Sequence, residues 1–103
     1  MRKSEMFSLV LNIVSEEMEL TPEQILSGSK CQEIVDARYI VVHFSRRCGI
    51  YISDIARMMN FSRRAIEKML SNFDERRKFS HHLFDIQYEL IAKKLRIACV
   101  PFH

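Results

Sequence analysis

The fold of this chain is decided by residues 51–70, which read YISDIARMMNFSRRAIEKML. Ser53 and Ser62 each stand at the start of a short run with helical spacing of apolar residues, and both are expected to cap a helix. Asn60 lies between the two runs and can adopt the left-handed conformation that a tight turn usually gives to glycine. The stretch therefore predicts a helix-turn-helix over about residues 52–72.

A long helix is predicted immediately upstream, over about residues 32–48. Its apolar residues recur on one stripe, and Gly49 supplies a left-handed stop. Arg38 and Arg46 lie on an adjacent stripe about two turns apart, so their side chains are expected to point the same way. The members of the apolar stripe are Ile34, Ala37, Val41, Phe44 and Cys48.

Two helices are predicted before this one. Ser4 is expected to cap the first, over about residues 5–18. Residues 21–24, TPEQ, have the pattern of a capping box with proline at the first helical position, and Gly28 is expected to close the short helix that follows. A polar loop that contains Lys30 then leads into the long helix.

A last helix, over about residues 80–98, brings the predicted total to six. Ser80 is expected to cap it, directly after the polar stretch 74–78. The fold class predicted for residues 1–103 is therefore a single all-α, six-helix compact domain that contains a helix-turn-helix. The apolar residues that recur along the last helix, and that are expected to face the core, are Leu83, Ile86, Leu90, Ile91 and Ile97.

The composition agrees with one small helical domain. The chain has 103 residues, of which 48% are apolar, and its two glycines and two prolines are too few for a turn-rich sandwich or barrel. No apolar stretch reaches the roughly 18 residues that span a bilayer, and the basic start is not followed by a secretion signal. Cys31, Cys48 and Cys99 fit neither a disulfide framework nor a zinc site, which favours small core residues in a reducing cytoplasm.

The net charge of +3 is unevenly distributed along the chain. Residues 1–28 have a net charge of −3, whereas residues 29–68 have a net charge of +4. A basic middle in a small helical protein favours a polyanionic partner, although charged solvated surfaces are commoner than nucleic-acid surfaces.

The second helix of the predicted helix-turn-helix begins with Ser62, Arg63 and Arg64. In a DNA-binding motif of this kind these side chains reach base edges in the major groove, where an arginine bound to guanine discriminates by about 1–3 kcal/mol. The competing interpretation is a simple ion pair between Arg63 and Glu67, worth about 0.3 kcal/mol. Ion pairing does not account for Arg64, because its neighbour one turn later is Lys68, a like charge.

Catalytic and metal-binding patterns are weak. His81 and Asp85 lie one helical turn apart, but a structural zinc site usually needs four ligands, and a surface histidine is favoured over a small metal-dependent enzyme. With Gly28 and Gly49 as its only glycines, the chain cannot form a normal glycine-rich phosphate loop. We expect no enzyme activity, no cofactor, no metal and no bound nucleotide.

Three stretches together resemble a known family. They are ELTPEQILSGSK (19–30), IVDARYIVV (34–42), and ISDIA with SRRAI within residues 52–66. In order and spacing they are similar to the C-terminal DNA-binding domain (domain IV) of the bacterial chromosomal replication initiator DnaA, an all-α, Trp-repressor-like fold. The similarity covers about residues 6–79, and it is more specific than a helix-turn-helix alone.

The resemblance implies a role for each matching position. Lys30 corresponds to the residue that enters the minor groove, and Ser53 lies near the DNA backbone. The family's recognition helix begins with an Asp-His-Thr signature, which is replaced here by Ser62, Arg63 and Arg64, so the initiator's own DNA box is not the expected target. The residues expected to face bases are Ser62, Arg63 and Arg64, and those expected to contact phosphates are Arg38, Arg46 and Lys68.

These observations predict a protein that binds double-stranded DNA at specific sequences. The ATPase domain of the initiator is absent from these residues, so we expect a cytoplasmic, nucleoid-associated accessory, regulatory or mobile-element protein acting in bacterial replication or transcription, with no membrane contact. The alternative is a protein-interaction module on the same fold that has lost DNA binding and recognises a replication or regulatory protein. The thinned basic loop, with Lys30 where the family has several arginines, and the acidic residues 1–28 support that alternative.

Overall fold

Helix α3 (Gln32–Arg47) forms the centre of the fold and confirms the helix predicted over residues 32–48. Ala37, Val41 and Phe44 on its predicted stripe are completely buried. The helix ends in a Schellman motif at Gly49, whose φ is +92°. There the Gly49 N–H donates to the Arg46 carbonyl at 3.0 Å and the Ile50 N–H donates to the Ser45 carbonyl at 3.2 Å.

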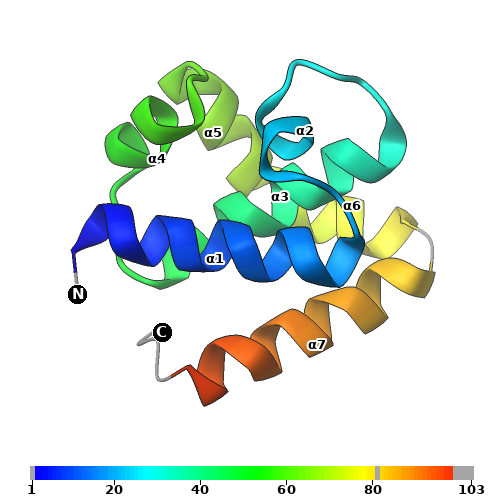
Figure 1. Ribbon diagram of the computed structural model, residues 1–103. Helices are drawn as coiled ribbons and strands as arrows, with labels where there is room; N and C mark the ends of the chain where they lie inside the picture. The colour runs from blue at the N-terminus through cyan, green and yellow to red at the C-terminus, as the bar shows by residue number, and fades with distance from the viewer. Residues whose placement is uncertain (1, 81, 99–103) are drawn as a thin grey trace.

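The computed structural model describes residues 2–80 and 82–98, and within these ranges the chain forms seven α-helices and no strand (Figure 1). Helices α1 and α7 pack against each other, and α1 also packs against α3. In the view of Figure 1, α7 lies along the bottom, α4 and α5 lie at the upper left, and α1 runs between them. The remaining helices are α1 (Lys3–Met18), α2 (Pro22–Leu26), α4 (Ile52–Met59), α5 (Arg63–Ser71), α6 (Phe73–Phe79) and α7 (His82–Ile97).

Helix α6 is the element that the sequence did not predict, since the polar stretch 74–78 lies inside it. Phe73 anchors the helix in the core with 4% of its surface exposed. The Arg76 Nε donates to Asp36 of α3 at 2.7 Å, and the Arg77 Nε donates to Asp85 of α7 at 2.6 Å. These long-range contacts stabilise a helix whose own apolar pattern is too weak to detect, so the six predicted helices become seven.

The prediction of which α7 residues face the core is wrong except at Ile91. Leu83, Ile86, Leu90 and Ile97 are exposed to solvent. The helix is apolar over more than one stripe, and the aromatic rings of the neighbouring stripe fit against α3 and α6, where Tyr88 stacks on Phe44 at a centroid distance of 4.9 Å. The residues that α7 buries are Phe84, Tyr88, Ile91, Ala92 and Leu95.

The capping box of α2 is present as predicted. The Gln24 N–H donates to the Thr21 hydroxyl at 3.1 Å, and the Thr21 N–H donates to the Gln24 side chain at 2.8 Å. The predicted stop at Gly28 is wrong, because α2 already ends at Leu26 and Ser27 takes an extended conformation.

Two other predicted caps are also wrong. Ser4 and Ser53 lie inside α1 and α4, and the N-cap positions belong to Arg2 and Tyr51, neither of which makes a side-chain capping bond. A serine at the N-cap and one at the first or second helical position look alike in sequence, since helix termini are uncertain by one or two residues. The cap predicted at Ser80 adjoins His81, which lies outside the described residues.

Two of the cysteines test the prediction that they are core residues. Cys48 is buried, whereas Cys31 is exposed at the start of α3. Cys99 lies outside the described residues. Among the helices that the structure describes, none is long and apolar enough to cross a membrane.

Candidate nucleic-acid interface

Helices α4 and α5 form a tight pair joined by the turn 60–62. Asn60 has the predicted left-handed conformation, with φ at 59°, and the Phe61 N–H donates to the Ala56 carbonyl at 3.0 Å. Ile55 of α4 and Ile66 of α5 are completely buried. The turn and the core contacts fix the angle between the two helices, so the first residues of α5 have a defined position on the surface.

The start of α5 is capped and strongly cationic. The Ala65 N–H donates to the Ser62 hydroxyl at 3.1 Å, which confirms the predicted cap. Arg63 and Arg64 occupy the first two helical positions, and the first turn contains no acidic residue. Each of the other helices in the described ranges has an Asp or Glu in its first turn. Two cations at the positive end of a helix dipole are unfavourable in the free protein and become favourable beside an anion.

The two arginines at the start of α5 differ in whether they form an ion pair. Arg63 donates to Glu67 at 3.2 Å, so the ion pair of the competing interpretation is present. Both side chains are largely exposed, and such a pair contributes only a few tenths of a kcal/mol. Arg64 and Lys68 are exposed and form no ion pair with any residue that the structure describes.

Arg38 does not point outward with Arg46, which corrects the prediction that the two side chains share a direction. Only 6% of Arg38 is exposed, and its Nε donates to the Ile25 carbonyl at 2.8 Å. Its Nη2 donates to the carbonyl of Ser29 at 2.6 Å and to that of Ser27. Because these bonds occupy the guanidinium inside the protein, the geometry gives Arg38 a structural role in place of the predicted phosphate contact.

Arg38 also connects two parts of the candidate interface. Its bonds hold the loop that follows α2, and its guanidinium carbon lies 5.5 Å from the centre of the Phe61 ring, which belongs to the turn between α4 and α5. Burial lowers the pKa of the Arg38 guanidinium, but an arginine keeps its charge in proteins. The residue therefore couples the position of the loop to the position of the turn.

The other predicted DNA contacts lie on the surface. Lys30 is exposed on the loop after α2, which lies on the same upper side of Figure 1 as α4 and α5. Arg46 is exposed at the end of α3, where its guanidinium approaches the carbonyl of Ile50 at 3.5 Å, just before α4. Ser53 is exposed on the first turn of α4. The structure thus leaves Lys30, Arg46 and Ser53 exposed on three different elements.

Two further cations belong to this surface but were not predicted. Arg57 of α4 donates to Asp54 at 3.0 Å, and Lys3 of α1 donates to the same carboxylate at 3.2 Å. These bonds, first that of Arg57 and then that of Lys3, lower the pKa of Asp54. Lys3 also lies 4.5 Å from the centre of the exposed Tyr51 ring. No sequence signal could have placed Lys3 here, because it belongs to the acidic N-terminal segment and reaches α4 only through the fold.

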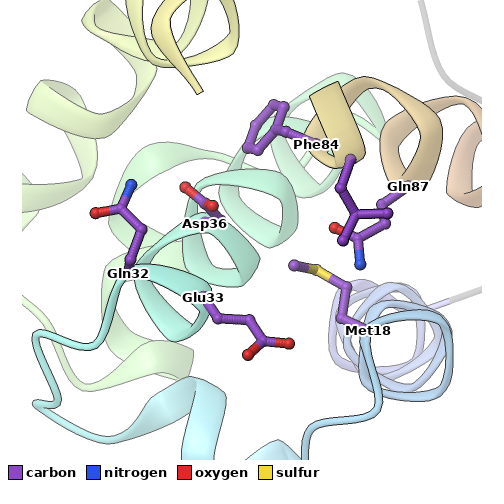
Figure 2. Close-up of a pocket in the computed structure, with 7 residues that line it drawn as sticks. Met18, Gln32, Glu33, Asp36, Phe84 and Gln87 are labelled. Carbon is purple, nitrogen blue, oxygen red and sulfur yellow. The ribbon is translucent and has the colours of Figure 1, made fainter. Parts of the chain in front are cut away.

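A cavity of about 350 Å³ lies away from this surface, between the end of α1, the start of α3 and the start of α7 (Figure 2). In Figure 2, Glu33 and Asp36 approach it from α3, while Met18 of α1 and Phe84 of α7 line the other side. Asp36 is already bound to Arg76 at 2.7 Å. One of the two carboxylates that line the cavity is therefore held by α6.

The pair proposed as a weak metal signal is only partly described. His81 lies outside the described residues, and Asp85 accepts a hydrogen bond from Arg77 at 2.6 Å. Within residues 2–80 and 82–98, no group of three or more His, Cys, Asp or Glu residues is arranged to hold a metal ion.

Comparison of the chain with models of protein families, with curated proteins and with solved structures finds no match.

Proposed function

We propose that this protein binds double-stranded DNA at specific sequences, with α4 and α5 acting as a helix-turn-helix whose second helix enters the major groove. The observation that carries the proposal is the start of α5, where Ser62 caps a helix that begins with two exposed arginines and no acidic residue. A helix N-terminus binds phosphate through its free N–H groups, and arginine is the commonest residue that recognises guanine.

The energetics of the free protein favour an anion at this place. Arg63 and Arg64 lie at the positive pole of the helix, and Arg64 faces Lys68 one turn later, a like-charge pair that costs a few tenths of a kcal/mol. A phosphate between these cations, or guanine acceptor atoms beside the arginines, removes both costs. The ion pair of Arg63 with Glu67 does not oppose this proposal, because an exposed pair exchanges easily for a new partner.

Three further cations complete the proposed surface. Lys30 extends from the loop after α2, Arg46 lies at the end of α3, and Lys68 lies on the exposed side of α5. These residues are proposed to contact phosphates or, for Lys30, the minor groove, with Ser53 near the backbone. Arg38 is proposed as a positioning residue, because its hydrogen bonds fix the loop that presents Lys30.

The resemblance in sequence to domain IV of the replication initiator supports the same conclusion. We infer that these residues form a relative of that domain and belong to an accessory, regulatory or mobile-element protein in the cytoplasm. Because Ser62, Arg63 and Arg64 replace the family's Asp-His-Thr signature, its target differs from the initiator's box and is expected to contain guanine under the start of α5.

The decisive experiment is selection from a random duplex library, followed by affinity measurements on the enriched duplex. The double variant Arg63→Ala, Arg64→Ala is expected to lose at least about 10-fold in affinity and to lose the preference for guanine. A matched control, Lys78→Ala with Arg96→Ala, removes the same charge from exposed positions on α6 and α7. Equal losses in both doubles, or unchanged affinity for every duplex after the first, would refute the proposal.

The alternative function, a protein-interaction module that has lost DNA binding, makes the opposite prediction. The exposed apolar side chains of α7, on the far side of the molecule from α5, are the observation that favours it. It requires that the chain binds no duplex even at low salt and that it forms a stable complex with a replication or regulatory protein.

A further inference from the structure

Helix α7 exposes a row of apolar side chains that the core does not use. The row, called here the α7 stripe, consists of Leu83, Ile86, Leu90 and Ile97, whose exposed fractions are 51%, 44%, 42% and 72%. Single exposed apolar residues are ordinary on protein surfaces, whereas several of them along one side of a helix favour a site of association.

The spacing of the stripe is that of a helix that packs against another helix. Positions 83, 86, 90, 93 and 97 are alternately three and four residues apart, as at the a and d positions of a heptad. Lys93 is the one polar member of this series. From Leu83 to Lys93 the spacing is the same in both chain directions, so the surface is complementary to itself in antiparallel order. In that order Ile86 meets Leu90 of a second copy, and Leu83 meets the aliphatic part of Lys93.

The charges on α7 also favour antiparallel pairing. The first half of the helix has Asp85 and Glu89, which both bind Arg77, and these three groups together have a net charge of −1. The second half has Lys93, Lys94 and Arg96, and with Glu17, which binds Lys94 at 2.8 Å, the net charge is +2. In the antiparallel register the two-fold axis lies at position 88, so the basic ends of the two helices lie far apart and Glu89 lies near Glu89 of the second copy, whereas a parallel pair places the two basic ends together.

We propose that two copies of this chain associate through antiparallel α7 helices related by a two-fold axis. A 16-residue helix is about 24 Å long, and an interface of that length stays below the roughly 1,200 Å² of stable complexes, so the dimer is weak and depends on concentration. Because α7 lies across the molecule from α4 and α5 in Figure 1, the dimer leaves the start of α5 exposed. The proposal does not depend on DNA binding and is tested in its absence.

Sedimentation equilibrium of the full chain over about a hundredfold range of concentration tests the proposal. The mean mass is expected to rise from 12.2 kDa toward twice that value. Leu90→Glu is expected to raise the dissociation constant at least about 30-fold, because it places a charge at the centre of the interface. Circular dichroism verifies that the variant is folded.

The matched control is Asn12→Glu, which adds the same charge at an exposed position of α1 and is expected to leave the dimer unchanged. A wild-type chain that stays monomeric over the whole range, or equal weakening by both variants, would overturn the proposal.

A series of sodium chloride concentrations tests the relative orientation of the two helices. A parallel pair would bring the two basic ends together and would tighten strongly in added salt, whereas the antiparallel pair keeps these ends apart and is expected to change little. A dimer that added salt tightens strongly would refute the antiparallel order.

Discussion

At the scale of single residues, Arg38 shows how a cation can serve an interface without touching its ligand. The side chain is buried, donates to three carbonyls around the loop after α2, and contacts the Phe61 ring of the α4–α5 turn. Hydrogen bonds to charged groups contribute about 1.5–3 kcal/mol each to stability, and the cost of burying the guanidinium opposes this gain. The residue therefore affects both the stability of the domain and the order of the loop.

Replacement of Arg38 by lysine is expected to lower the free energy of unfolding by about 2–4 kcal/mol, because a single ammonium cannot span three carbonyls in the fork geometry of a guanidinium. Urea denaturation measures this change. The matched control is Arg46→Lys on the same helix, which is exposed and should change stability by less than about 0.5 kcal/mol. An Arg38→Lys variant that is as stable as wild type and has an unaltered loop would contradict the role of Arg38 in holding the loop after α2.

His43 is predicted to make stability depend on pH. Its ring stacks on Phe73 at 4.0 Å, its Nε2 lies 3.0 Å from the Tyr88 hydroxyl, and burial together with Arg47 and Arg77 lowers its pKa from 6.5 to about 4. Between those two values the unfolded chain binds more protons than the native protein, so stability falls as the pH is lowered through this window and is fully present above it.

The full pKa shift corresponds to about 3 kcal/mol, and the partial exposure of the His43 ring reduces the expected loss between pH 7 and pH 4 to about 1–2 kcal/mol. Urea denaturation at several pH values measures it. His43→Phe keeps an aromatic ring on Phe73 but cannot be protonated. The free energy of unfolding of this variant should therefore fall by about 1–2 kcal/mol less over the same pH range. Identical pH profiles for the two proteins would show that His43 is not the group responsible.

At the scale of elements, α5 combines a good cap with an unfavourable charge at its start. Ser62 satisfies a backbone N–H, but Arg63 and Arg64 oppose the helix dipole. A helix selected only for stability would have an acidic residue in this turn, as the other described helices have. Stability is therefore expected to conflict with binding at this place.

Arg64→Glu tests that conflict directly. The change places an acidic group at the positive pole and converts a like-charge pair with Lys68 into a favourable one, so the free energy of unfolding should rise by about 0.5–1 kcal/mol. Affinity for the selected duplex should fall at least about 10-fold. Arg64→Gln, which removes the charge without adding one, is expected to lie between wild type and Arg64→Glu in both measurements. A variant that is more stable and binds DNA as before would exclude Arg64 from the interface.

In α7 the sequence pattern did not identify which side of the helix is buried. Its apolar residues form two neighbouring stripes, one in the core and one exposed, and periodicity cannot tell which stripe is buried. The core takes the stripe that contains Phe84 and Tyr88, because their rings complete the aromatic cluster with His43, Phe44 and Phe73. The other stripe is exposed, and the proposed association uses it.

At the scale of the whole molecule, the two candidate surfaces lie on opposite sides of α1 (Figure 1). The cationic surface gathers around α4 and α5, and the apolar one follows α7. This separation means that one surface can be altered without disturbing the other. Leu90→Glu should therefore leave the affinity of a single chain for a single duplex unchanged, and Arg64→Glu should leave the self-association unchanged.

The salt dependence of DNA binding is also a property of the whole surface. With Arg38 buried, the cations proposed to neutralise charge on the DNA backbone are Arg46 and Lys68, together with Lys30 in the minor groove, and the logarithm of affinity is expected to fall with the logarithm of salt concentration with a slope of about −2.7. Arg46→Ala should reduce this slope by about 0.9 and weaken all duplexes alike. Fluorescence anisotropy over a salt series measures both. A flat response would refute the electrostatic part of the proposal.

The sequence by itself determined the features that depend on a few neighbouring residues. The capping box at Thr21, the stop at Gly49, the left-handed turn at Asn60 and the cap at Ser62 all follow from hydrogen bonds that span about five residues or fewer, and all four are present. The cationic start of α5 follows from the same local pattern.

Only the tertiary structure decided which groups meet across the fold. It turned Arg38 inward onto the carbonyls of the α2 loop, brought Lys3 to Asp54, formed α6 around Phe73, and exposed the stripe of α7 that the sequence predicted to be buried. The physical reason is that helical periodicity fixes the side on which a residue lies within its own helix, whereas burial depends on the shape and charge of the helices packed against it.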